Sequence, residues 1–216
     1  MSPRRSDVTI VLQNCFTKQT GVREFKRIQL AGEDFYEGEV LDEQLNGKGK
    51  VSVISKGMEY QGDWFNNQRH GQGVETWSDG RVYSGDFTQD QKEGYGELTL
   101  PDGTTYSGSF KKGAFDGFGS LNKSKAYQYT GNFINGMRQG PGKMLYANGD
   151  YYDGLFFKGK HHGQGIFYCG ITQVTYEGEW FNGQKHGIGY VSEEGFAKTK
   201  VLYQEGVQVS TLEQKS

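Results

Sequence analysis

The sequence has few of the residue types and segments that mark several common protein classes. Only 3 of its 216 residues are proline and only 2 are cysteine, Cys15 and Cys169. Two cysteines cannot build a disulfide framework, which indicates a reducing compartment. No apolar run approaches about 20 residues, so no membrane-spanning helix is predicted, and the apolar stretch Val8–Leu12 is too short for a signal peptide. The net charge of −2 gives no general attraction to nucleic acid, so nucleic acid is not an expected partner.

Glycine and aromatic residues are abundant instead. The chain has 34 glycines, 14 tyrosines, 14 phenylalanines and 3 tryptophans, whereas hydrophobic residues of all kinds make up 34%. This much glycine with so little proline excludes a collagen-like chain, and so many aromatic residues argue against simple disorder. A chain this poor in hydrophobic residues cannot easily bury one large central core, so it needs another way to bury its rings.

A repeat of 23 or 24 residues runs through most of the chain. Its first element is Tyr-x-Gly-x-aromatic, with valine replacing the aromatic residue in the first unit, and its second is a Gly-x-Gly pair that begins eleven residues after the tyrosine. The repeats start at Tyr36, Tyr60, Tyr83, Tyr106, Tyr129, Tyr152 and Tyr176. Their glycine pairs start at Gly47, Gly71, Gly94, Gly117, Gly140, Gly163 and Gly187. Self-similarity at a fixed period is the signature of a repeat architecture.

Each repeat is predicted to form an antiparallel hairpin. Folding the second repeat about Asn67–Gln68 predicts that Trp64 lies opposite Gly71, so that the ring covers a residue without a side chain. The same register places Tyr60 opposite Glu75. In the other repeats the residue facing the tyrosine is apolar in six cases: Val51, Leu98, Leu121, Met144, Phe167 and Val191.

The fold class predicted from this pattern is all-β. We expect an elongated single-layer antiparallel meander of stacked hairpins, twisted or curled, with no helix longer than two turns between residues 36 and 195. One face is expected to be aromatic and lined by glycine, and the other polar. The domain boundaries follow: an N-terminal tail and degenerate capping hairpin over 1–35, seven repeats over 36–202, and a partial repeat, cap and tail over 203–216.

The repeat resembles the MORN (membrane occupation and recognition nexus) family. The closest unit is YEGEWFNGQKHGIG, Tyr176 to Gly189, and YQGDWFNNQRHGQG, Tyr60 to Gly73, is nearly as close. The first unit departs in having Val40 and Asn46, and the fourth departs most in its Asp116 and in the SKAY segment that replaces an Asp-Gly turn. The chain is most similar to the repeat-only members of axonemes and other cytoskeletal assemblies, which implies a structural role.

No catalytic or metal site is predicted. His70, His162 and His186 each precede a Gly-x-Gly pair, with His161 adjacent, but they belong to different hairpins and no cysteine or carboxylate completes a ligand set. The glycine pairs recur inside strands and never open a helix, so they do not fit a phosphate-binding loop. We therefore expect a protein that is not an enzyme and needs no cofactor.

The aromatic face is the first candidate binding surface. A single layer must cover this face by curling, by dimerising or by binding a ligand. The expected partner is an extended or helical peptide, or a second copy of the chain. The predicted protein-binding groove comprises Tyr60, Trp64, Glu75, Trp77, Tyr83, Phe87, Tyr106, Phe110, Tyr129, Phe133, Tyr152, Phe156, Tyr176 and Trp180.

Two further rows of residues allow alternative interpretations. The cations Arg69, Lys92, Arg138 and Lys185 share one register with His161, and Leu45 and Phe115 interrupt it. This row is either a solvated edge or a stripe that binds acidic phospholipid. Phe65, Ile134, Phe157 and Phe181 follow the strand aromatic directly, and they either pack under lysine stems or form a second contact patch.

The function predicted from the sequence is a non-catalytic scaffold or adaptor that binds a partner segment along the aromatic groove. From the family resemblance, its expected location is cytoplasmic and cytoskeleton-associated, in the axoneme of a cilium or flagellum, where a radial-spoke-like role is one possibility. The alternative is a peripheral membrane protein that binds acidic phospholipids through the basic row.

Overall fold

Antiparallel strands account for nearly all regular structure in the computed structural model, which describes residues 21–214, with side chains to residue 212. The chain divides after Gln91 into two compact units, called unit 1 (described over 21–91) and unit 2 (described over 92–214). Within residues 21–214 the only helical segment is a 3-10 turn, Ile54–Lys56. The predicted all-β meander of hairpins is therefore confirmed, as is the absence of a long helix between residues 36 and 195.

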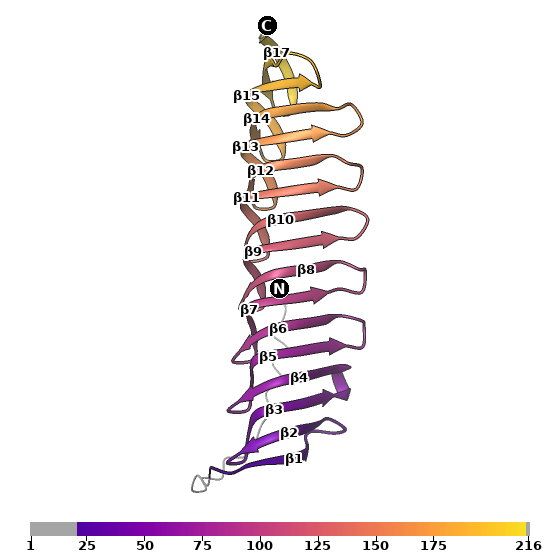
Figure 1. Ribbon diagram of the computed structural model, residues 1–216, viewed down its shortest axis with the longest axis vertical. Coiled ribbons are helices and arrows are strands. Elements are labelled where there is room, and N and C mark those ends of the chain that lie inside the picture. The colour runs from indigo at the N-terminus through magenta and orange to yellow at the C-terminus, as the bar shows by residue number, and fades with distance from the viewer. Residues whose placement is uncertain (1–20, 215–216) are drawn as a thin grey trace. The chain divides into compact units, whose positions relative to one another are not determined.

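The strands of each unit pair with their neighbours in chain order (Figure 1). Unit 1 contains β1 Arg23–Gln29, β2 Phe35–Leu41, β3 Gln44–Val53, β4 Met58–Phe65, β5 Gln68–Trp77 and β6 Val82–Thr88. Strand β7, Gln91–Thr99, begins at the boundary and leads into unit 2. Unit 2 continues with β8 Thr105–Lys111, β9 Ala114–Lys123, β10 Tyr127–Ile134, β11 Met137–Tyr146, β12 Tyr151–Phe157, β13 Lys160–Cys169, β14 Val174–Phe181, β15 Gln184–Glu193, β16 Thr199–Gln204 and β17 Val207–Gln214.

The hairpin turns lie one residue earlier than predicted. The turn of the second repeat is Asn66–Asn67, not Asn67–Gln68, and both residues are left-handed, with φ of 48° and 65°. Two left-handed residues define the type I′ turn, whose twist matches that of the flanking strands. The turns between hairpins fall at Asp79-Gly80, Asp102-Gly103 and Asn148-Gly149, where turns are expected in such sequences.

The predicted register is correct at the tyrosine and wrong at the strand aromatic. Tyr60 does pair with Glu75, but a β-bulge after Gly62 shifts the register, so Trp64 faces Arg69. Gly71 instead pairs with Phe87 of the next hairpin. Its φ of +59° is one that side-chain-bearing residues rarely adopt, so the first glycine of the pair is needed for the bulge and not to make room for the ring of its own hairpin.

In six of the seven repeats, the second glycine of the pair makes room for the tyrosine of the same hairpin. A Cβ atom on Gly73 would lie 2.3 Å from Cε2 of Tyr60, and one on Gly62 would lie 2.5 Å from the Tyr60 hydroxyl oxygen. The ring therefore lies along the two glycines, and its hydroxyl donates a hydrogen bond to the Asp63 carbonyl at 2.9 Å. The same i to i+3 hydrogen bond recurs at Tyr36, Tyr83, Tyr106, Tyr129, Tyr152 and Tyr176.

Edge-to-face ring contacts link successive hairpins into a core within each unit. In unit 1, Trp64 contacts Tyr36 and Tyr60 with centroid distances of 5.4 and 5.3 Å. In unit 2, Phe156 contacts Tyr129 and Tyr152 at 5.0 and 5.1 Å in the same way. Such pairs contribute about 0.5–1.5 kcal/mol beyond the area they bury. The hairpins thus bury their rings against neighbours without a central aliphatic core.

The strands at the two ends carry different edge features. Strand β1, within the region predicted as a capping hairpin, has charged residues along its length, which oppose pairing with another chain. The partner strand predicted for its capping hairpin lies in residues 8–20, outside the described residues. At the other end, β17 has two irregularities in its pairing with β16, and bulges also disfavour edge-to-edge pairing.

Candidate binding surfaces

The rings of the predicted protein-binding groove lie in the core. Twelve of the predicted groove residues are the repeat tyrosines and the strand aromatics that follow them, and each is at most 7% exposed. These rings therefore do not form an open groove, because the flat packing over glycine and the edge-to-face contacts cover them. They include Tyr60, Trp64, Tyr83, Phe87, Tyr106, Phe110, Tyr129, Phe133, Tyr152, Phe156, Tyr176 and Trp180.

Glu75 and Trp77 also pack, although they were expected at an open groove rim. The Glu75 side chain is 6% exposed and forms an ion pair with Arg69 at 2.5 Å. The Trp77 indole Nε1 donates a hydrogen bond to Glu75 Oε1 at 3.0 Å. Arg69 also bonds Asp90 Oδ1, with Nε at 3.1 Å. Glu75, the acidic residue opposite the repeat tyrosine Tyr60, is thus held within a network of hydrogen bonds and ion pairs.

The row that contains the cations covers the faces of the tyrosine rings. We call it the stacking row, and it consists of Leu45, Arg69, Lys92, Phe115, Arg138, His161 and Lys185. Phe115 is stacked on Tyr106 with a centroid distance of 3.7 Å, and His161 is stacked on Tyr152 at 3.6 Å. Leu45 is 1% exposed. The position therefore accepts aromatic rings that stack on a tyrosine as well as a buried leucine, so it is not defined by positive charge.

The cations of the stacking row follow the same geometry. The guanidinium carbon of Arg138 lies 5.7 Å from the Tyr129 ring centroid, and Lys185 Nζ lies 4.7 Å from that of Tyr176. Lys92 is half-buried. Burial lowers the pKa of Lys185 from its usual value and lowers that of His161 to about 4. These contacts direct the cations onto the rings, so the row differs from a fully solvated edge.

The residues that follow the strand aromatic, which we call the phenylalanine row, lie on the face opposite the aromatic face and beside histidines. The row consists of Phe65, Ile134, Phe157 and Phe181. His162 lies between Phe157 and Phe181 with centroid distances of 5.3 and 5.4 Å. His70 contacts Phe65 at 5.7 Å. The row remains about half exposed at Phe65, Ile134, Phe157 and Phe181. Lys158 Nζ lies 5.3 Å from the Phe157 ring centroid, which supports the lysine-stem interpretation at that position. In the part of the chain that the structure describes, no three His, Cys, Asp or Glu side chains gather as a metal site.

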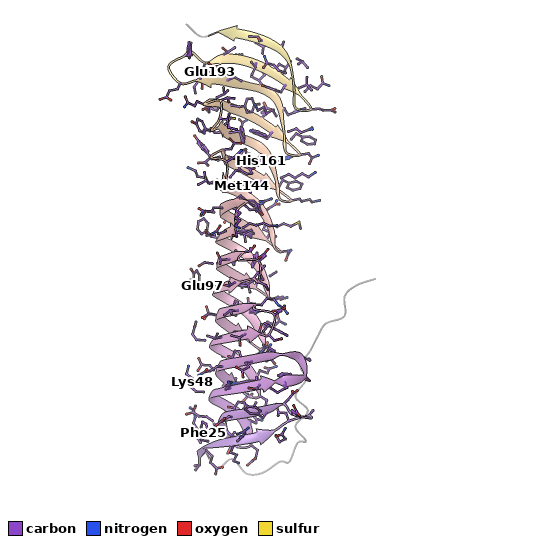
Figure 2. All side chains as sticks on the ribbon, turned by 90° about the vertical axis from the view of Figure 1, so that its right-hand side faces the viewer. Phe25, Lys48, Glu97, Met144, His161 and Glu193 are labelled. Atoms are coloured by element: carbon purple, nitrogen blue, oxygen red, sulfur yellow. The ribbon has the colours of Figure 1, made fainter. Side chains whose placement is uncertain are left out.

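The face of the sheet opposite the aromatic face is called the outer face. In unit 1, the outer face carries an open groove of about 750 Å³. Exposed backbone at Gly49, Gly62 and Gly73 forms part of its lining. Phe25 and Lys48, both labelled in Figure 2, contribute side chains from β1 and β3. The other lining residues are Glu37, Lys50, Gln61, Gln72, Val74 and Ser84.

The groove exposes more apolar than polar surface, and two of its three charged side chains, Lys48 and Lys50, form ion pairs. Lys48 Nζ lies 2.6 Å from Asp63 Oδ1, and Lys50 Nζ lies 2.9 Å from Glu59 Oε1. Phe25 and Val74 add apolar area, being 69% and 40% exposed. Sequence reasoning assigned this face to solvent and missed the groove. The available signal was the middle residue of each Gly-x-Gly pair, which points to the outer face and varies in character between repeats.

Comparison with known proteins identifies the repeat. The family model described as "MORN repeat" matches residues 60–80, 83–105, 106–122, 129–151, 152–171 and 176–190, more than half of the chain. Residues 36–59 are not among these matches, although Tyr36 makes the same hydrogen bond, to the Glu39 carbonyl at 2.8 Å. No curated protein matches the chain. Within the described residues, no helix is long and apolar enough to cross a membrane.

Among solved structures, one similar chain is the SAS-4 (dCPAP) TCP domain of Drosophila melanogaster, solved in complex with a proline-rich motif of Ana2 (dSTIL). The match is 6% identical in sequence, with a TM-score of 0.45, and covers 91% of this chain and 99% of that chain. At this level of similarity, no conclusion about function or partner follows from it.

Proposed function

Since the chain belongs to the MORN-repeat family, a family of non-enzymatic repeats, we propose that it is a protein-interaction scaffold whose partner binds the outer face. The supporting observation is that the two faces of the sheet differ in whether they are covered. The aromatic face is used to hold the hairpins together, whereas the outer face of unit 1 carries the open groove of about 750 Å³. Ligand-binding surfaces are typically concave, with some apolar area and a few polar groups.

The groove favours a polypeptide segment over a small polar ligand. It is lined by residues of every strand from β1 to β6, a distance of about 24 Å at the usual strand spacing. A segment of about seven extended residues covers that length. The amides of Gln61 and Gln72 can donate to and accept from its backbone, while Phe25 and Val74 offer apolar contact.

We propose a cytoskeletal assembly, such as a ciliary or flagellar axoneme, as the setting of this scaffold. The support is the similarity to repeat-only family members noted in the sequence. Binding of acidic phospholipid through the stacking row receives no support from the ring contacts of Arg69, Arg138 and Lys185, because those contacts occupy the cations.

The test is capture of partners by the immobilised full chain from an extract of ciliated cells, quantified by mass spectrometry. The groove variant is Phe25→Asp with Val74→Asp, and the matched control is Ile54→Asp, which changes an exposed apolar side chain outside the groove. We expect proteins bound by the wild type to be lost from the groove variant and kept by the control. Equal capture by all three chains would contradict the groove assignment.

Vesicles that contain phosphatidylserine provide the second arm. We expect no co-sedimentation of the wild-type chain at moderate ionic strength. Co-sedimentation that disappears in the variant Arg69→Glu/Lys92→Glu/Arg138→Glu/Lys185→Glu, while partner capture is absent, would instead support the phospholipid alternative.

A further inference from the structure

Three residues on the outer face of unit 2 form an apolar row that unit 1 lacks. Tyr95, Phe118 and Pro141 are the middle residues of three successive Gly-x-Gly pairs, and we call them the outer ridge. Tyr95 and Phe118 are 58% and 62% exposed, and Pro141 is also exposed. The corresponding residues of unit 1 are Lys48 and Gln72. Large exposed aromatic rings in register are typical of an interaction surface.

The strand register sets the spacing of the outer ridge. Tyr95 of β7 pairs with Ser109 of β8, and Phe118 of β9 pairs with Asn132 of β10, so successive ridge residues are two strands apart. Two strand spacings amount to about 9.6 Å, and the ridge from Tyr95 to Pro141 is about 19 Å long. A partner that contacts all three residues must therefore cross the strands with a contact every 9 to 10 Å or so.

The residues between the ridge positions carry no charge. Ser109 and Asn132 pair with ridge residues, and Ser107 and Thr130 lie beside them on the same face. The Ser109 hydroxyl and the Asn132 amide are hydrogen-bond donors, whereas Ser107 Oγ already lies 2.6 Å from the Tyr95 hydroxyl oxygen and Thr130 Oγ1 lies 3.4 Å from Ser120 Oγ. The nearest charged residues along β7 on this face are Glu93 and Glu97, each two positions from Tyr95, and Glu97 is labelled in Figure 2. Uncharged donors that lie directly between the apolar contacts suit a partner segment that has carbonyl groups to satisfy.

We propose that the outer ridge binds a proline-rich segment in the polyproline II conformation, with an apolar residue at every third position. This inference rests on the proposed scaffold function and names a partner class for unit 2. Polyproline II has three residues per turn and rises 3.1 Å per residue, so every third residue recurs after about 9.3 Å. It forms no internal hydrogen bonds, and its carbonyl groups can accept from Ser109 and Asn132.

Other occupants fit the ridge less well. A helix repeats a face every seven residues, about 10.5 Å, but its carbonyl groups are already bonded and leave the donors of the ridge unused. Strand addition needs a sheet edge, whereas the ridge runs across strands that pair on both sides. A second copy of the chain would bury only a few hundred Å² here, well below the ~800 Å² per partner of a stable interface.

Fluorescence anisotropy with the full chain tests the proposal. The probe is a labelled (Pro-Pro-Leu)4 peptide, and the flexibility control is (Gly-Ser-Leu)4, which keeps the leucine spacing without the preformed conformation. We expect saturable binding of the proline peptide at micromolar to sub-millimolar concentration, and at least tenfold weaker binding of the control peptide. Equal binding of the two peptides would overturn the proposal. So would the absence of binding of the proline peptide at about 1 mM.

Paired variants locate the binding. Tyr95→Ser with Phe118→Ser should weaken binding of the proline peptide at least tenfold, whereas Phe25→Ser in unit 1 should leave it unchanged. All three side chains are exposed, so the melting temperatures should stay within a few degrees of the wild type. Unchanged binding by the Tyr95/Phe118 variant would overturn the assignment to the ridge. Loss of captured cellular partners from that variant without any binding of the proline peptide would reject the polyproline II class but retain the scaffold function.

Discussion

The hairpin turns of the two units share one backbone conformation but are built from different residues. In unit 1 neither residue of the turn is glycine: the pairs are Asp42–Glu43, Asn66–Asn67 and Gln89–Asp90, all with positive φ. In unit 2 the second residue is always glycine: Gly113, Gly136, Gly159, Gly183 and Gly206. A side-chain-bearing residue in the left-handed region costs about 1–2 kcal/mol, and less for Asn and Asp. At the second turn position, unit 1 therefore carries a strain that unit 2 avoids, whereas the first position has a non-glycine residue in both units.

The side chains of the unit 1 turns offset that strain by bonding to the preceding hairpin. Asn67 Oδ1 accepts a hydrogen bond from the Leu45 backbone N–H at 2.7 Å, and Asp90 Oδ1 accepts one from the Arg69 backbone N–H at 3.0 Å. In unit 2 the direction is reversed. Glu93 of one hairpin accepts from the Lys112 backbone N–H of the next turn at 2.9 Å. Successive hairpins can thus be linked either by a turn side chain that bonds to the preceding hairpin or by a strand side chain that bonds to the following turn. Turn composition alone therefore does not define the repeat.

The largest effect should come from the glycine under the tyrosine, in either unit. In unit 2 a Cβ atom on Gly142 would lie 2.4 Å from the Tyr129 hydroxyl oxygen, whereas one on Gly140 would come no closer than 3.9 Å to a neighbour. Gly142→Ala should therefore cost about 3 kcal/mol of unfolding free energy, and Gly140→Ala about 1 kcal/mol for its φ of +77°. Urea unfolding of the full chain measures both. Equal costs, or a larger cost at Gly140, would contradict the packing of tyrosine over the second glycine.

The next effect concerns a network that is specific to unit 1. The first repeat has Leu45 and Val51 where the second has Arg69 and Glu75. Glu75→Ala alone should cost about 2–3 kcal/mol, because Arg69 and Trp77 lose a buried partner. The double variant Arg69→Leu/Glu75→Val restores the chemistry of the first repeat and should stay within about 1 kcal/mol of the wild type. A double variant as unstable as Glu75→Ala would show that the charges cannot be replaced by apolar packing.

The turn comparison itself predicts a smaller effect. Asn67→Ala removes the bond to Leu45 while keeping the left-handed backbone, and should cost about 1–2 kcal/mol. Asn67→Gly removes the same bond but relieves the strain, so it should cost less than Asn67→Ala. In unit 2, Gly136→Ala should cost about 1 kcal/mol from strain alone. If Asn67→Gly proves as harmful as Asn67→Ala, strain is not what separates the two kinds of turn.

The last effect is a pH dependence that belongs to unit 2. Burial holds the pKa of His161 near 4, below the value of about 6.5 expected in the unfolded chain. The unfolded chain therefore binds the proton more readily, and this contribution to stability is present above pH 6.5 and is lost as pH falls towards 4. His161→Phe, which introduces the residue that the fourth repeat has at Phe115, should flatten the fall in melting temperature between those pH values, and His70→Gln on the outer face should not. Parallel pH profiles for wild type and His161→Phe would contradict the stacked neutral imidazole.

Much of the fold follows from spacing, because a fixed interval between tyrosine and glycine pair specifies a hairpin. The pairing of Tyr60 with Glu75 and the all-β meander were predictable in this way. The bulge was not, because Gly71 and Gly73 look alike in the sequence while one relieves backbone strain and the other makes room for a ring. Repetition identifies both positions but does not say which physical need each glycine meets.

The candidate surfaces were harder to predict than the fold. Parity correctly grouped the rings on one face, but it could not show that laying Tyr60 over Gly62 and Gly73 leaves the rings covered. The stacking row looked basic because Arg69 and Lys185 are charged, although its shared property is a flat contact with a ring. The groove of unit 1 depends on the shape of the sheet, to which composition gives no guide.

Hydroxyl-radical footprinting of the full chain, read residue by residue by mass spectrometry, tests the central claim that the aromatic face is core and the outer face is the available surface. The tyrosines of the repeats provide the matched set, since Tyr60, Tyr129 and Tyr152 are 0% exposed whereas Tyr95 is 58% exposed. We predict strong oxidation of Tyr95 and Phe118 and protection of the three buried tyrosines. Oxidation of those three at rates similar to that of Tyr95 would contradict the account, because it would show that the aromatic face is an open surface able to bind a partner.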